Sequence, residues 1–522
     1  MIKLVAYTTE SIANEILIRD SEGEHIKSAD VNQLLGFLNE PYSDRETFAI
    51  KVCWDLDETL APVLRRLGIS ACRELAGPEH TYRNLFYISS KVFAIHGKES
   101  QSYFYHLSQY YPDEPEPEDA ETIAAMAQNV MDAFHQMGLN PKKLTSPIAI
   151  YEQEVLSHMQ IPTIMNIPGK HEELLDYAEQ CTGRLWIQAY CVGHWLAGEA
   201  FEYDMRSCYP NIASKLRSLQ YAKYAKSKWF DPNADWGFLK GVVTINENVN
   251  IHPIFYDGDV TNSQPVGTWP TYMTLHDYNF IKKWGIGDFK MESGYFLKFT
   301  APVMPMEVPL RRLFNQRGQG GLVNSIAKRI STAMGYGKFL EKHEDGTVGK
   351  FFNPPYAAMI NSIANLQVCE FIYKHGLQDN VIHVGVDSVI ADTYIDLPRQ
   401  NNVPMGGWRF TGSDDLLVLS SGRVYHREKK PQGLNYEEIV ELISKKPRQS
   451  YYTANLKRRQ TLEESIQLND LNGLGKRKST TSSFDLNLLR ASRDREYPKF
   501  PMTGEQLLNG QFKSFPININ GK

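Results

Sequence analysis

Asp204 and Asp387 are the residues of this chain whose type and placement could do chemistry. Asp204 lies in Phe-Glu-Tyr-Asp-Met-Arg-Ser-Cys-Tyr-Pro-Asn (201–211), and Asp387 lies in Val-Ile-His-Val-Gly-Val-Asp-Ser-Val-Ile-Ala-Asp (381–392). Both aspartates border apolar runs that are typical of buried strands. Two carboxylates brought together from distant strands can hold a pair of Mg²⁺ ions, which would activate a 3′-hydroxyl and stabilise a leaving pyrophosphate. If the two aspartates meet, the chemistry is nucleotidyl transfer.

The segment that begins at Asp204 has the form Asp-x-x-Ser-x-Tyr-Pro. An aspartate that leaves a strand can bind Mg²⁺ while the next carbonyl, that of Met205, binds the same ion. Backbone amides in the turn around Ser207 could cradle a triphosphate. Tyr209 would close the sugar pocket and exclude a 2′-hydroxyl. The alternative is a surface aspartate that opens a turn, with Tyr209 in the core.

A third group of residues is basic and lies upstream of Asp387. The chain from 306 to 340 predicts two helices that break at 317–321, and a cation on the second helix could hold β- and γ-phosphates. A solvated basic helix face is the alternative interpretation. The phosphate-binding candidates, and the ring and glycine that would approach a base, are Arg317, Lys328, Arg329, Tyr336 and Gly337.

Alternating strands and helices must position these residues. The first 70 residues predict a β-β-α-β-α order, typical of an α/β layer fold, with a hairpin from 2–7 and 14–19, a helix at 29–39, a strand at 48–54 and a helix around Leu60. Further on, we expect helices at 119–137 and 354–375, several short strands in 235–300, and a strand–turn–strand hairpin with Asp387 at its tip. The last 90 residues predict a few amphipathic helices.

A basic patch interleaved with aromatic side chains follows Asp204. It could track a nucleic-acid backbone, because phosphate neutralisation and base stacking need these residue types. An amphipathic helix with a solvated basic face is the alternative. The patch consists of Lys215, Arg217, Tyr221, Lys223, Tyr224, Lys226, Lys228 and Trp229.

The length of 522 residues indicates several domains, and a hydrophobic content of 42% is sufficient to build their cores. A net charge of -5 argues against a protein that coats DNA wholesale. The 6 cysteines form no Cys-x-x-Cys pair, so neither a zinc site nor a disulfide framework is indicated. No run of about 18 apolar residues occurs. We expect a protein of a bacterial or virus-infected host cytoplasm.

These elements, in this order, resemble a family B DNA polymerase, and residues 1–430 resemble its small protein-primed branch from phages and mobile elements. Thr182-Gly183-Arg184 resembles the family's link between exonuclease and polymerase parts, and Asn353-Pro354-Pro355-Tyr356-Ala357 resembles the start of the palm helix. The motif matches are Asp204, Ser207 and Tyr209 for motif A, Arg317 with Lys328 or Arg329 and Tyr336-Gly337 for motif B, Asp387-Ser388 for motif C, and Arg423-Val424-Tyr425 for the primer-supporting Lys-x-Tyr.

The resemblance implies a multidomain α+β and α/β fold, with an RNase H-like exonuclease-type N-terminal domain and a right-hand polymerase of palm, fingers and thumb. The implied parts are the exonuclease-like domain (1–140), a linker (141–200), the palm (201–304 and 346–430), the fingers (305–345), and the thumb with a C-terminal tail (431–522).

The implied activity is template-directed transfer of a nucleotide from a dNTP to a primer 3′-hydroxyl, with two Mg²⁺ or Mn²⁺ ions. Primer-template DNA, dNTPs and a terminal protein or other priming factor are the implied partners. Asp204, Met205 and Asp387 would hold the metal ions. Primer or template contacts would come from Gly183, Arg184, Gly337, Ser388, Arg423 and Tyr425.

The sequence departs from the family pattern at several places. Motif C reads Gly385-Val386-Asp387 where the family has Asp-Thr-Asp, and Ala333 and Met334 fill the Asn-Ser places of motif B. The first exonuclease motif, normally Asp-x-Glu, aligns with Thr8-Thr9-Glu10. The second retains Asp55 or Asp57, and the third retains Asp119 without its usual tyrosine.

Two alternatives follow from these departures. We expect proofreading to be lost, and the alternative is a rearranged nuclease site of Glu10, Asp57 and Asp119. For the whole chain, the alternative to a polymerase is a non-catalytic nucleic-acid-binding platform derived from a family B polymerase.

Overall fold

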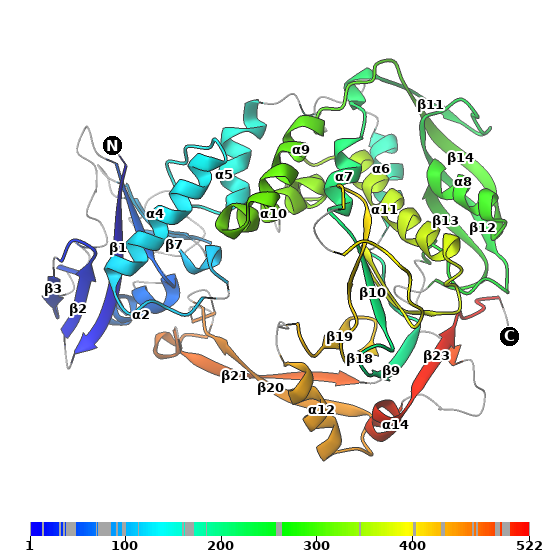
Figure 1. The fold of residues 1–522 in the computed structure, drawn as a ribbon. Helices are drawn as coiled ribbons and strands as arrows, with labels where there is room; N and C mark the ends of the chain where they lie inside the picture. The colour runs from blue at the N-terminus through cyan, green and yellow to red at the C-terminus, as the bar shows by residue number, and fades with distance from the viewer. Residues whose placement is uncertain are drawn as a thin grey trace. The chain divides into compact units, whose positions relative to one another are not determined.

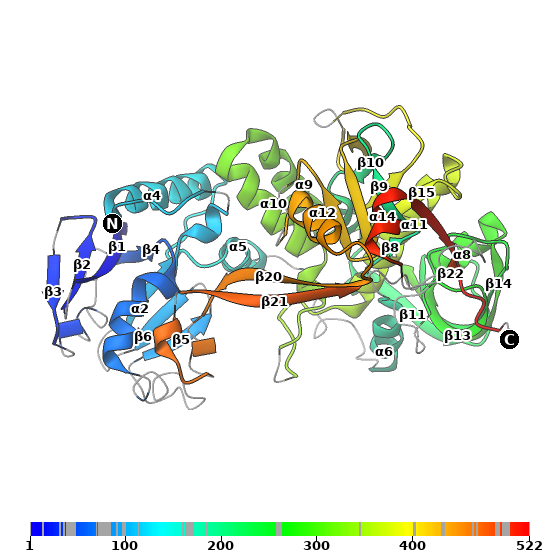
Figure 2. The same ribbon diagram turned by 90° about the horizontal axis from the view of Figure 1, so that it is seen from below.

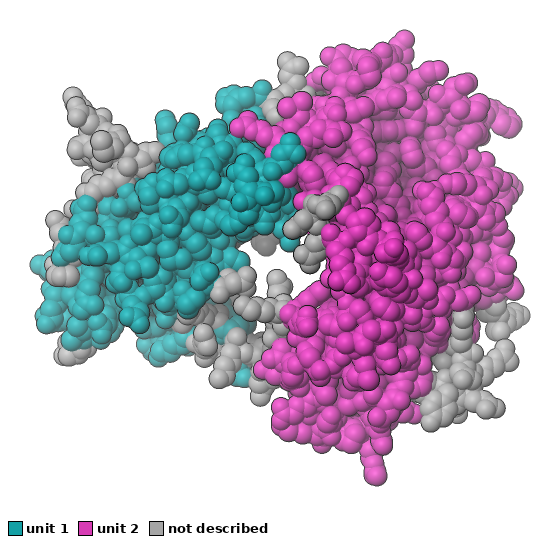
Figure 3. All heavy atoms as spheres, in the orientation of Figure 1, with its two compact units in different colours: residues 1–159, 315–330, 455–481 teal, residues 160–314, 331–454, 482–522 magenta. Residues whose placement is uncertain are grey.

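The structure of the protein is a computed structural model that describes residues 2–12, 15–23, 25–30, 33–34, 37, 48–68, 70, 85–89, 92–96, 101–112, 114–158, 161, 172–183, 185–256, 264–343, 346–399, 403–429, 434–461, 464–465, 468–474, 476–485, 491–492 and 502–520. It divides into two compact units, coloured separately in Figure 3. Unit 1 comprises residues 1–159, 315–330 and 455–481, and unit 2 comprises 160–314, 331–454 and 482–522. Within the described ranges, no helix has both the length and the hydropathy needed to cross a lipid bilayer.

Unit 1 is built on a seven-stranded mixed sheet in the order β3-β2-β1-β4-β7-β6-β5. Figure 1 shows β3 and β2 beside β1 at one edge of this sheet. The predicted hairpin and strand are confirmed: β1 is antiparallel to β2 and parallel to β4. The helix expected at 29–39 lies largely outside the described residues. The strands are β1 (Ile2–Ile12), β2 (Glu15–Asp20), β3 (His25–Ser28), β4 (Phe48–Cys53), β5 (Leu85–Ser89), β6 (Val92–His96) and β7 (Gln101–His106).

Two predicted helices of unit 1, α2 (Leu56–Leu67) and α4 (Ala120–Gln136), are confirmed and pack against β1. Each begins at an aspartate whose side chain accepts a backbone N–H of the first turn, which satisfies a donor that the helix leaves without a partner. The apolar face of α2 then joins the buried core around Tyr7 and Phe104.

Unit 2 holds a five-stranded sheet in the order β17-β10-β16-β15-β8, which carries the candidate site. One face packs on a core shared with α11 (Pro354–Lys374), where the ring of Phe371 lies 5.7 Å from that of Tyr203. The helix expected at 354–375 is thereby confirmed. The strands are β8 (Ile187–Ala189), β10 (Phe201–Met205), β15 (Val381–Gly385), β16 (Ser388–Ala391) and β17 (Trp408–Gly412). β8 lies within the segment that we predicted as a linker.

A four-stranded antiparallel sheet follows the first aspartate, in the order β11-β14-β12-β13. The strands expected in 235–300 are present among the described residues of that segment, but they are longer than predicted, and the helix α8 (Leu275–Trp284) was not expected. The helical interpretation of the basic patch was wrong, because pairing with β14 makes 222–227 a strand. The strands are β11 (Ala222–Ser227), β12 (Trp236–Ile245), β13 (Gly267–Thr274) and β14 (Gly287–Phe299).

The C-terminal part of the chain contains more strand than predicted. Helices α12 (Tyr436–Lys445) and α14 (Gly504–Asn509) form, but β20 (Tyr451–Arg459) and β21 (Arg477–Asp485) pair as a long two-stranded ribbon (Figure 2). Another sheet of unit 2 has the order β19-β18-β9-β23-β22, from β9 (Cys191–Trp195), β18 (Leu416–Ser420), β19 (Arg423–His426), β22 (Ala491–Ser492) and β23 (Gln511–Phe515).

The break in the basic helical segment lies where the glycines predicted it. Helix α9 (Glu307–Gln316) ends in the short 3₁₀ turn η5 (Arg317–Gln319), and α10 (Gly321–Gly335) follows. Gly320 takes a φ of +80°, which glycine adopts without a Cβ clash. Residues up to 330 of α10 belong to unit 1, and its last turn belongs to unit 2.

Candidate catalytic site

The sheet of unit 2 places Asp204, on β10, beside the turn that carries Asp387 at the start of β16. β10 is antiparallel to β16, with Asp204 opposite Ser388, and the Met205 N–H donates to the Asp387 carbonyl at 3.0 Å. Both carboxylates act on one buried thiol: burial raises the pKa of Cys208, and the charges of Asp387 and Asp204 raise it further. The two aspartates, which are more than a third of the chain apart in sequence, therefore both lie near the Cys208 thiol.

Asp387 occupies the tip of the predicted hairpin, between β15 and β16. Val386 before it has a φ of +63°, which is rare for a β-branched residue. Three hydrogen bonds hold this turn: Val386 N–H to the Trp186 carbonyl at 2.7 Å, and the Asp387 N–H and Ser388 hydroxyl to the Gly385 carbonyl at 2.8 and 3.0 Å. These bonds hold the backbone of the turn that carries Asp387.

Ser207 is a second strained position beside the aspartates. It takes a φ of +54° immediately before helix α7 (Cys208–Ser214). Among the described residues only Ser207, Val386 and Asn469 combine a side chain with positive φ. Such conformations persist where the surroundings impose them, and they are frequent at functional sites. Two of these three residues, Ser207 and Val386, therefore lie next to the aspartates of the candidate site.

Tyr209 and Tyr336, predicted to shape a nucleotide pocket, are in contact. Their ring centroids lie 5.2 Å apart, and the Tyr209 hydroxyl is buried with no partner among the residues described. Burial raises the pKa of both phenols, to about 12 for Tyr336. The last residue of α10, Gly335, lies so close that a Cβ there would be 2.9 Å from the Pro210 nitrogen. Glycine is therefore required for this approach of α10 to α7.

Arg409 is a site residue that the sequence did not reveal. β17 places it directly opposite Asp204, and its Nε and Nη2 donate to Asp204 Oδ2 at 2.9 and 2.5 Å. No local pattern marks this arginine, because its role depends on the register between two distant strands.

The two aspartates fit a metal site whose remaining ligands come from the substrate and from water. In the part of the chain that the structure describes, no group of three or more His, Cys, Asp or Glu side chains could hold a metal ion. Mg²⁺ is commonly bound by one or two carboxylates together with substrate phosphates and water. Asp204 on β10 and Asp387 in the turn before β16 meet that requirement, and a closed all-protein cage is not needed.

The remaining cationic candidates lie in unit 1. Arg317 is in η5, and Lys328 and Arg329 are in α10. Arg329 is half-buried and its Nη1 donates to the backbone carbonyl of Gln109, whereas Lys328 is exposed. Arg329 therefore contributes to the stability of unit 1.

The predicted primer and template residues occupy several elements of unit 2. Gly183 takes a φ of +63° after α6 (Glu172–Cys181), and Arg184 lies outside the described residues. Arg423 and Tyr425 are on β19, and Tyr425 packs against the core of α12 and α14. Ser388 begins β16, and Gly337 follows α10.

The acids predicted for a degenerate nuclease have separate surroundings in unit 1. Asp55 and Asp119 are the N-caps of α2 and α4, and hydrogen bonds from Thr122 lower the pKa of Asp119. Asp57 lies in the first turn of α2, where a negative charge is favourable. Glu10 is exposed on β1, 3.9 Å from Arg19. Asp55, three residues before Glu58, is a sequence signal for the start of a helix, which gives this aspartate a structural role.

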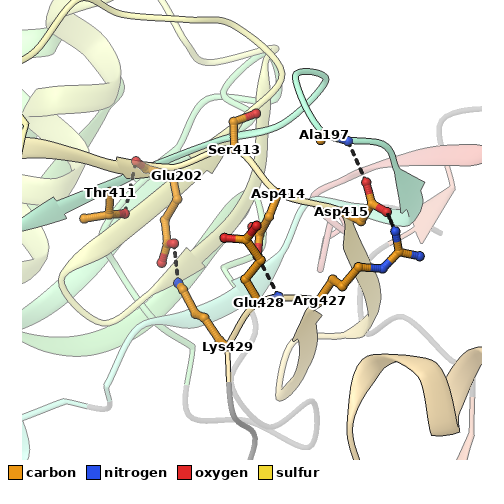
Figure 4. A pocket seen from close by; sticks show the side chains of 10 residues that line it. Ala197, Glu202, Thr411, Ser413, Asp414, Asp415, Arg427, Glu428 and Lys429 are labelled. Atoms are coloured by element: carbon orange, nitrogen blue, oxygen red, sulfur yellow. Dashed lines mark hydrogen bonds and ion pairs between the residues drawn. The ribbon is translucent and has the colours of Figure 1, made fainter.

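A polar pocket of about 400 Å³ adjoins β10 and β17 in unit 2 (Figure 4). Glu202, on β10, forms an ion pair with Lys429, and Asp415 pairs with Arg427. The Asp415 carboxylate also accepts the Ala197 N–H at 2.8 Å. Both acids therefore have cationic partners within the pocket.

We expect the stability of the protein to depend on pH through His383, which lies on β15. Its Nε2 lies 2.8 Å from the Ser421 carbonyl, and burial lowers its pKa to about 4. The unfolded chain takes up this proton near pH 6.5 and the folded chain only near pH 4, so acidification between these values favours unfolding. We expect a loss of roughly 3 kcal/mol in the free energy of unfolding between pH 6.5 and 4.

Urea unfolding of the wild type and of His383→Gln at several pH values between 7 and about 4 measures this term. The glutamine variant should lose less stability on acidification, and the exposed His343→Gln should behave as the wild type. Equal pH dependence in the wild type and His383→Gln would contradict the assignment.

Comparison with known proteins points to one fold. No protein-family model and no curated protein sequence matches the chain. Among solved structures, Phi29 DNA polymerase complexed with primer-template DNA and incoming nucleotides is similar, with a TM-score of 0.61, 12% identity, and 93% of this chain and 99% of that chain covered. Its orthorhombic crystal form gives a TM-score of 0.59 at 12% identity, covering 93% and 100% of the two chains.

A third structure, Phi29 DNA polymerase with single-stranded DNA, gives a TM-score of 0.53 at 12% identity, and 92% of each chain is covered. At this identity the likeness shows the fold. The chain therefore has the multidomain α+β fold of a DNA polymerase, as expected from the sequence, and the individual domain boundaries stay predictions.

Proposed function

We propose that this protein is a template-directed DNA polymerase of the protein-primed family B type, without proofreading. It would transfer a nucleotide from a dNTP to a primer 3′-hydroxyl. The observation that carries the proposal is the position of Asp204 on β10 beside the turn that holds Asp387, in a fold similar to that of Phi29 DNA polymerase. Phage or mobile-element replication, primed by a terminal protein or another factor, is the setting we infer.

The roles of the side chains follow from their surroundings. Asp204, Asp387 and the Met205 carbonyl would hold two Mg²⁺ or Mn²⁺ ions, which supply charge stabilisation of the attacking and leaving oxygens. Tyr209, fixed against Tyr336, would exclude a 2′-hydroxyl, with Ser207 in the turn before it.

Other residues would position the substrates without contacting the reacting atoms. Arg317 and Lys328 would hold the triphosphate, because cations stabilise the charge of a phosphate chain. Arg423 and Tyr425 would support the primer end. Gly183, Arg184, Gly337 and Ser388 would contact primer or template.

A primer-extension assay tests the proposed function. Labelled primer on a longer template, incubated with dNTPs and Mg²⁺ or Mn²⁺, should be extended to a length set by the template. A parallel reaction with rNTPs tests the role of Tyr209, and we expect little extension. Single-stranded DNA should stay untrimmed, and trimming that disappears in Asp57→Ala would restore the nuclease alternative.

A second candidate function is a non-catalytic nucleic-acid-binding platform. The ion pair between Arg409 and Asp204 favours it, because a salt bridge alone would justify an aspartate at this place. Gly385 also stands where the family has a further carboxylate. Tight binding of primer-template DNA with no extension in either Mg²⁺ or Mn²⁺ would support this alternative.

The four-stranded sheet of unit 2 offers a place for a DNA strand. Lys223 on β11 lies directly opposite Lys298 on β14, and both are exposed. Like charges at such a pair are unfavourable unless an anion lies over them. Trp229 is 83% exposed and Tyr221 is 42% exposed, so their rings are available for stacking. We propose that a single strand follows these residues.

Two other cations of the basic patch have structural partners. Lys226 pairs with Glu173, and Arg217 pairs with Asp235 at 3.1 Å. We therefore assign DNA contacts to the lysine pair on β11 and β14 and to neighbouring Lys228, and exclude these two cations from the prediction.

Replacing Lys223 and Lys298 by alanine should flatten the salt dependence of single-strand binding. Each lost phosphate contact lowers the slope of log K against log salt by about 0.7, so the double variant should lose about 1.4. Fluorescence anisotropy of a labelled oligonucleotide, titrated at several salt concentrations, measures the slope. The control variant, Lys282→Ala with Lys283→Ala, removes the same charge from α8 and should leave the slope unchanged. An unchanged slope in the β11 variant would remove these lysines from the DNA path.

A further inference from the structure

Arg409 and Asp204 form the tightest polar contact of the candidate site. Two guanidinium nitrogens, Nε and Nη2, donate to the same carboxylate oxygen, Oδ2, and each side chain is 23% exposed. A partly buried, charge-assisted pair of this kind is stronger than an exposed one, because water screens it less. The strand register holds both partners in place, since β17 pairs with β10 at these two positions.

A second arginine, Arg206, adds positive charge close to Arg409. Its Nη1 donates to the Val403 carbonyl at 2.7 Å, and its guanidinium lies 4.7 Å from the centre of the Phe314 ring. Burial lowers the pKa of Arg206, and the charge of Arg409 lowers it further. Two arginines thus accompany the two aspartates, and the formal charges of these four side chains cancel.

We propose that Arg409 competes with a divalent cation for the Asp204 carboxylate and thereby sets the cation affinity of this centre. This inference rests on the proposed function, which makes the same carboxylate a metal ligand. A cation on Oδ2 has to displace two hydrogen bonds, and a cation on Oδ1 lies close to a positive charge. Either arrangement weakens binding. Arg409 is a positioning residue, because it acts through Asp204.

The same charge balance predicts how cation and nucleotide cooperate. A triphosphate supplies negative charge that offsets the two guanidinium groups and adds oxygen ligands. Cation binding should therefore be weak alone and stronger when a nucleotide is present. Removal of the Arg409 charge should reduce this dependence, because Asp204 then becomes fully available to the cation.

Direct titration of Mn²⁺, followed by the electron paramagnetic resonance signal of the free ion without DNA or nucleotide, tests the proposal. Arg409→Gln should bind Mn²⁺ at least about tenfold more tightly than the wild type, since a unit charge within hydrogen-bonding distance is removed. Arg409→Lys keeps the charge but loses the two-nitrogen contact, so its gain should be smaller.

Two variants serve as references. Arg427→Gln removes the same charge from the Asp415 pair in the pocket of Figure 4 and should leave Mn²⁺ affinity unchanged. In Asp204→Asn with Arg409→Gln the gain should disappear, which separates binding at Asp204 from binding elsewhere. Thermal unfolding of each variant establishes that it is folded, and Arg409→Lys preserves a test if the glutamine variant is not.

Equal or weaker Mn²⁺ affinity in Arg409→Gln overturns the proposal, and so does the absence of measurable Mn²⁺ binding in every variant. The titration needs no catalysis. A protein that binds Mn²⁺ as expected but extends no primer would therefore reject the polymerase function and leave the role of Arg409 standing.

Discussion

Primer extension by Asp387→Asn and by Asp204→Asn should fall at least about a thousandfold below that of the wild type. Each change replaces a carboxylate by an amide of the same shape, so the strand pairing of β10 and β16 persists while a negatively charged ligand is lost. Charge stabilisation at the reacting phosphate is the main contribution that such a site makes to the rate. Single-turnover extension on a primed template measures the loss.

DNA affinity provides the internal control for these variants. Binding of primer-template DNA in the absence of metal ions should change little, and the exposed Asp396→Asn, in the loop after β16, should extend primers as the wild type does. Extension retained by either aspartate variant would reject the assignment of the metal ligands.

Gly335→Ala should produce the second large loss of activity, through packing alone. The added Cβ would lie 2.9 Å from the Pro210 nitrogen and 3.0 Å from the Tyr209 carbonyl carbon, and both are backbone atoms that have to move. Overpacking of this kind costs about 1–3 kcal/mol in stability. A displacement of about 1 Å at a reacting centre can cost a factor of about 100 in rate. We expect a raised KM for dNTP and a lowered kcat.

Steady-state extension kinetics and thermal unfolding of the same preparation separate the two effects of Gly335→Ala. Gly412→Ala is the matched control, because a Cβ at Gly412 meets no atom within 4 Å. Wild-type kinetics in Gly335→Ala would mean that the contact between α10 and α7 does not position the nucleotide pocket.

The sequence predicted those elements that are determined by residues close together in the chain. Valine and isoleucine on both sides of Asp387 indicated the hairpin, and the glycines at 318, 320 and 321 indicated the break between α9 and α10. The strands that meet at the two aspartates were also expected, because each is a short apolar run bounded by polar residues. These signals depend on neighbours within a few positions along the chain.

Features that depend on distant pairing could not be predicted. Arg409 faces Asp204 across 205 positions, and that register is decided by the fit of whole strands in the sheet. The residues of β11 carry a helix-like mixture of lysine, alanine and tyrosine, yet pairing with β14 makes them a strand.

The sheet that contains β9 pairs strands that the ribosome synthesises at widely separated times. β9 pairs with β23, and His194 and Gln511 lie 317 positions apart in the chain. At a usual rate of translation, β23 emerges roughly 15 to 60 seconds after β9. During that interval one edge of β9 has no permanent neighbour, and unpaired edges recruit other strands. Nascent chains should therefore depend on chaperones until that strand has been translated.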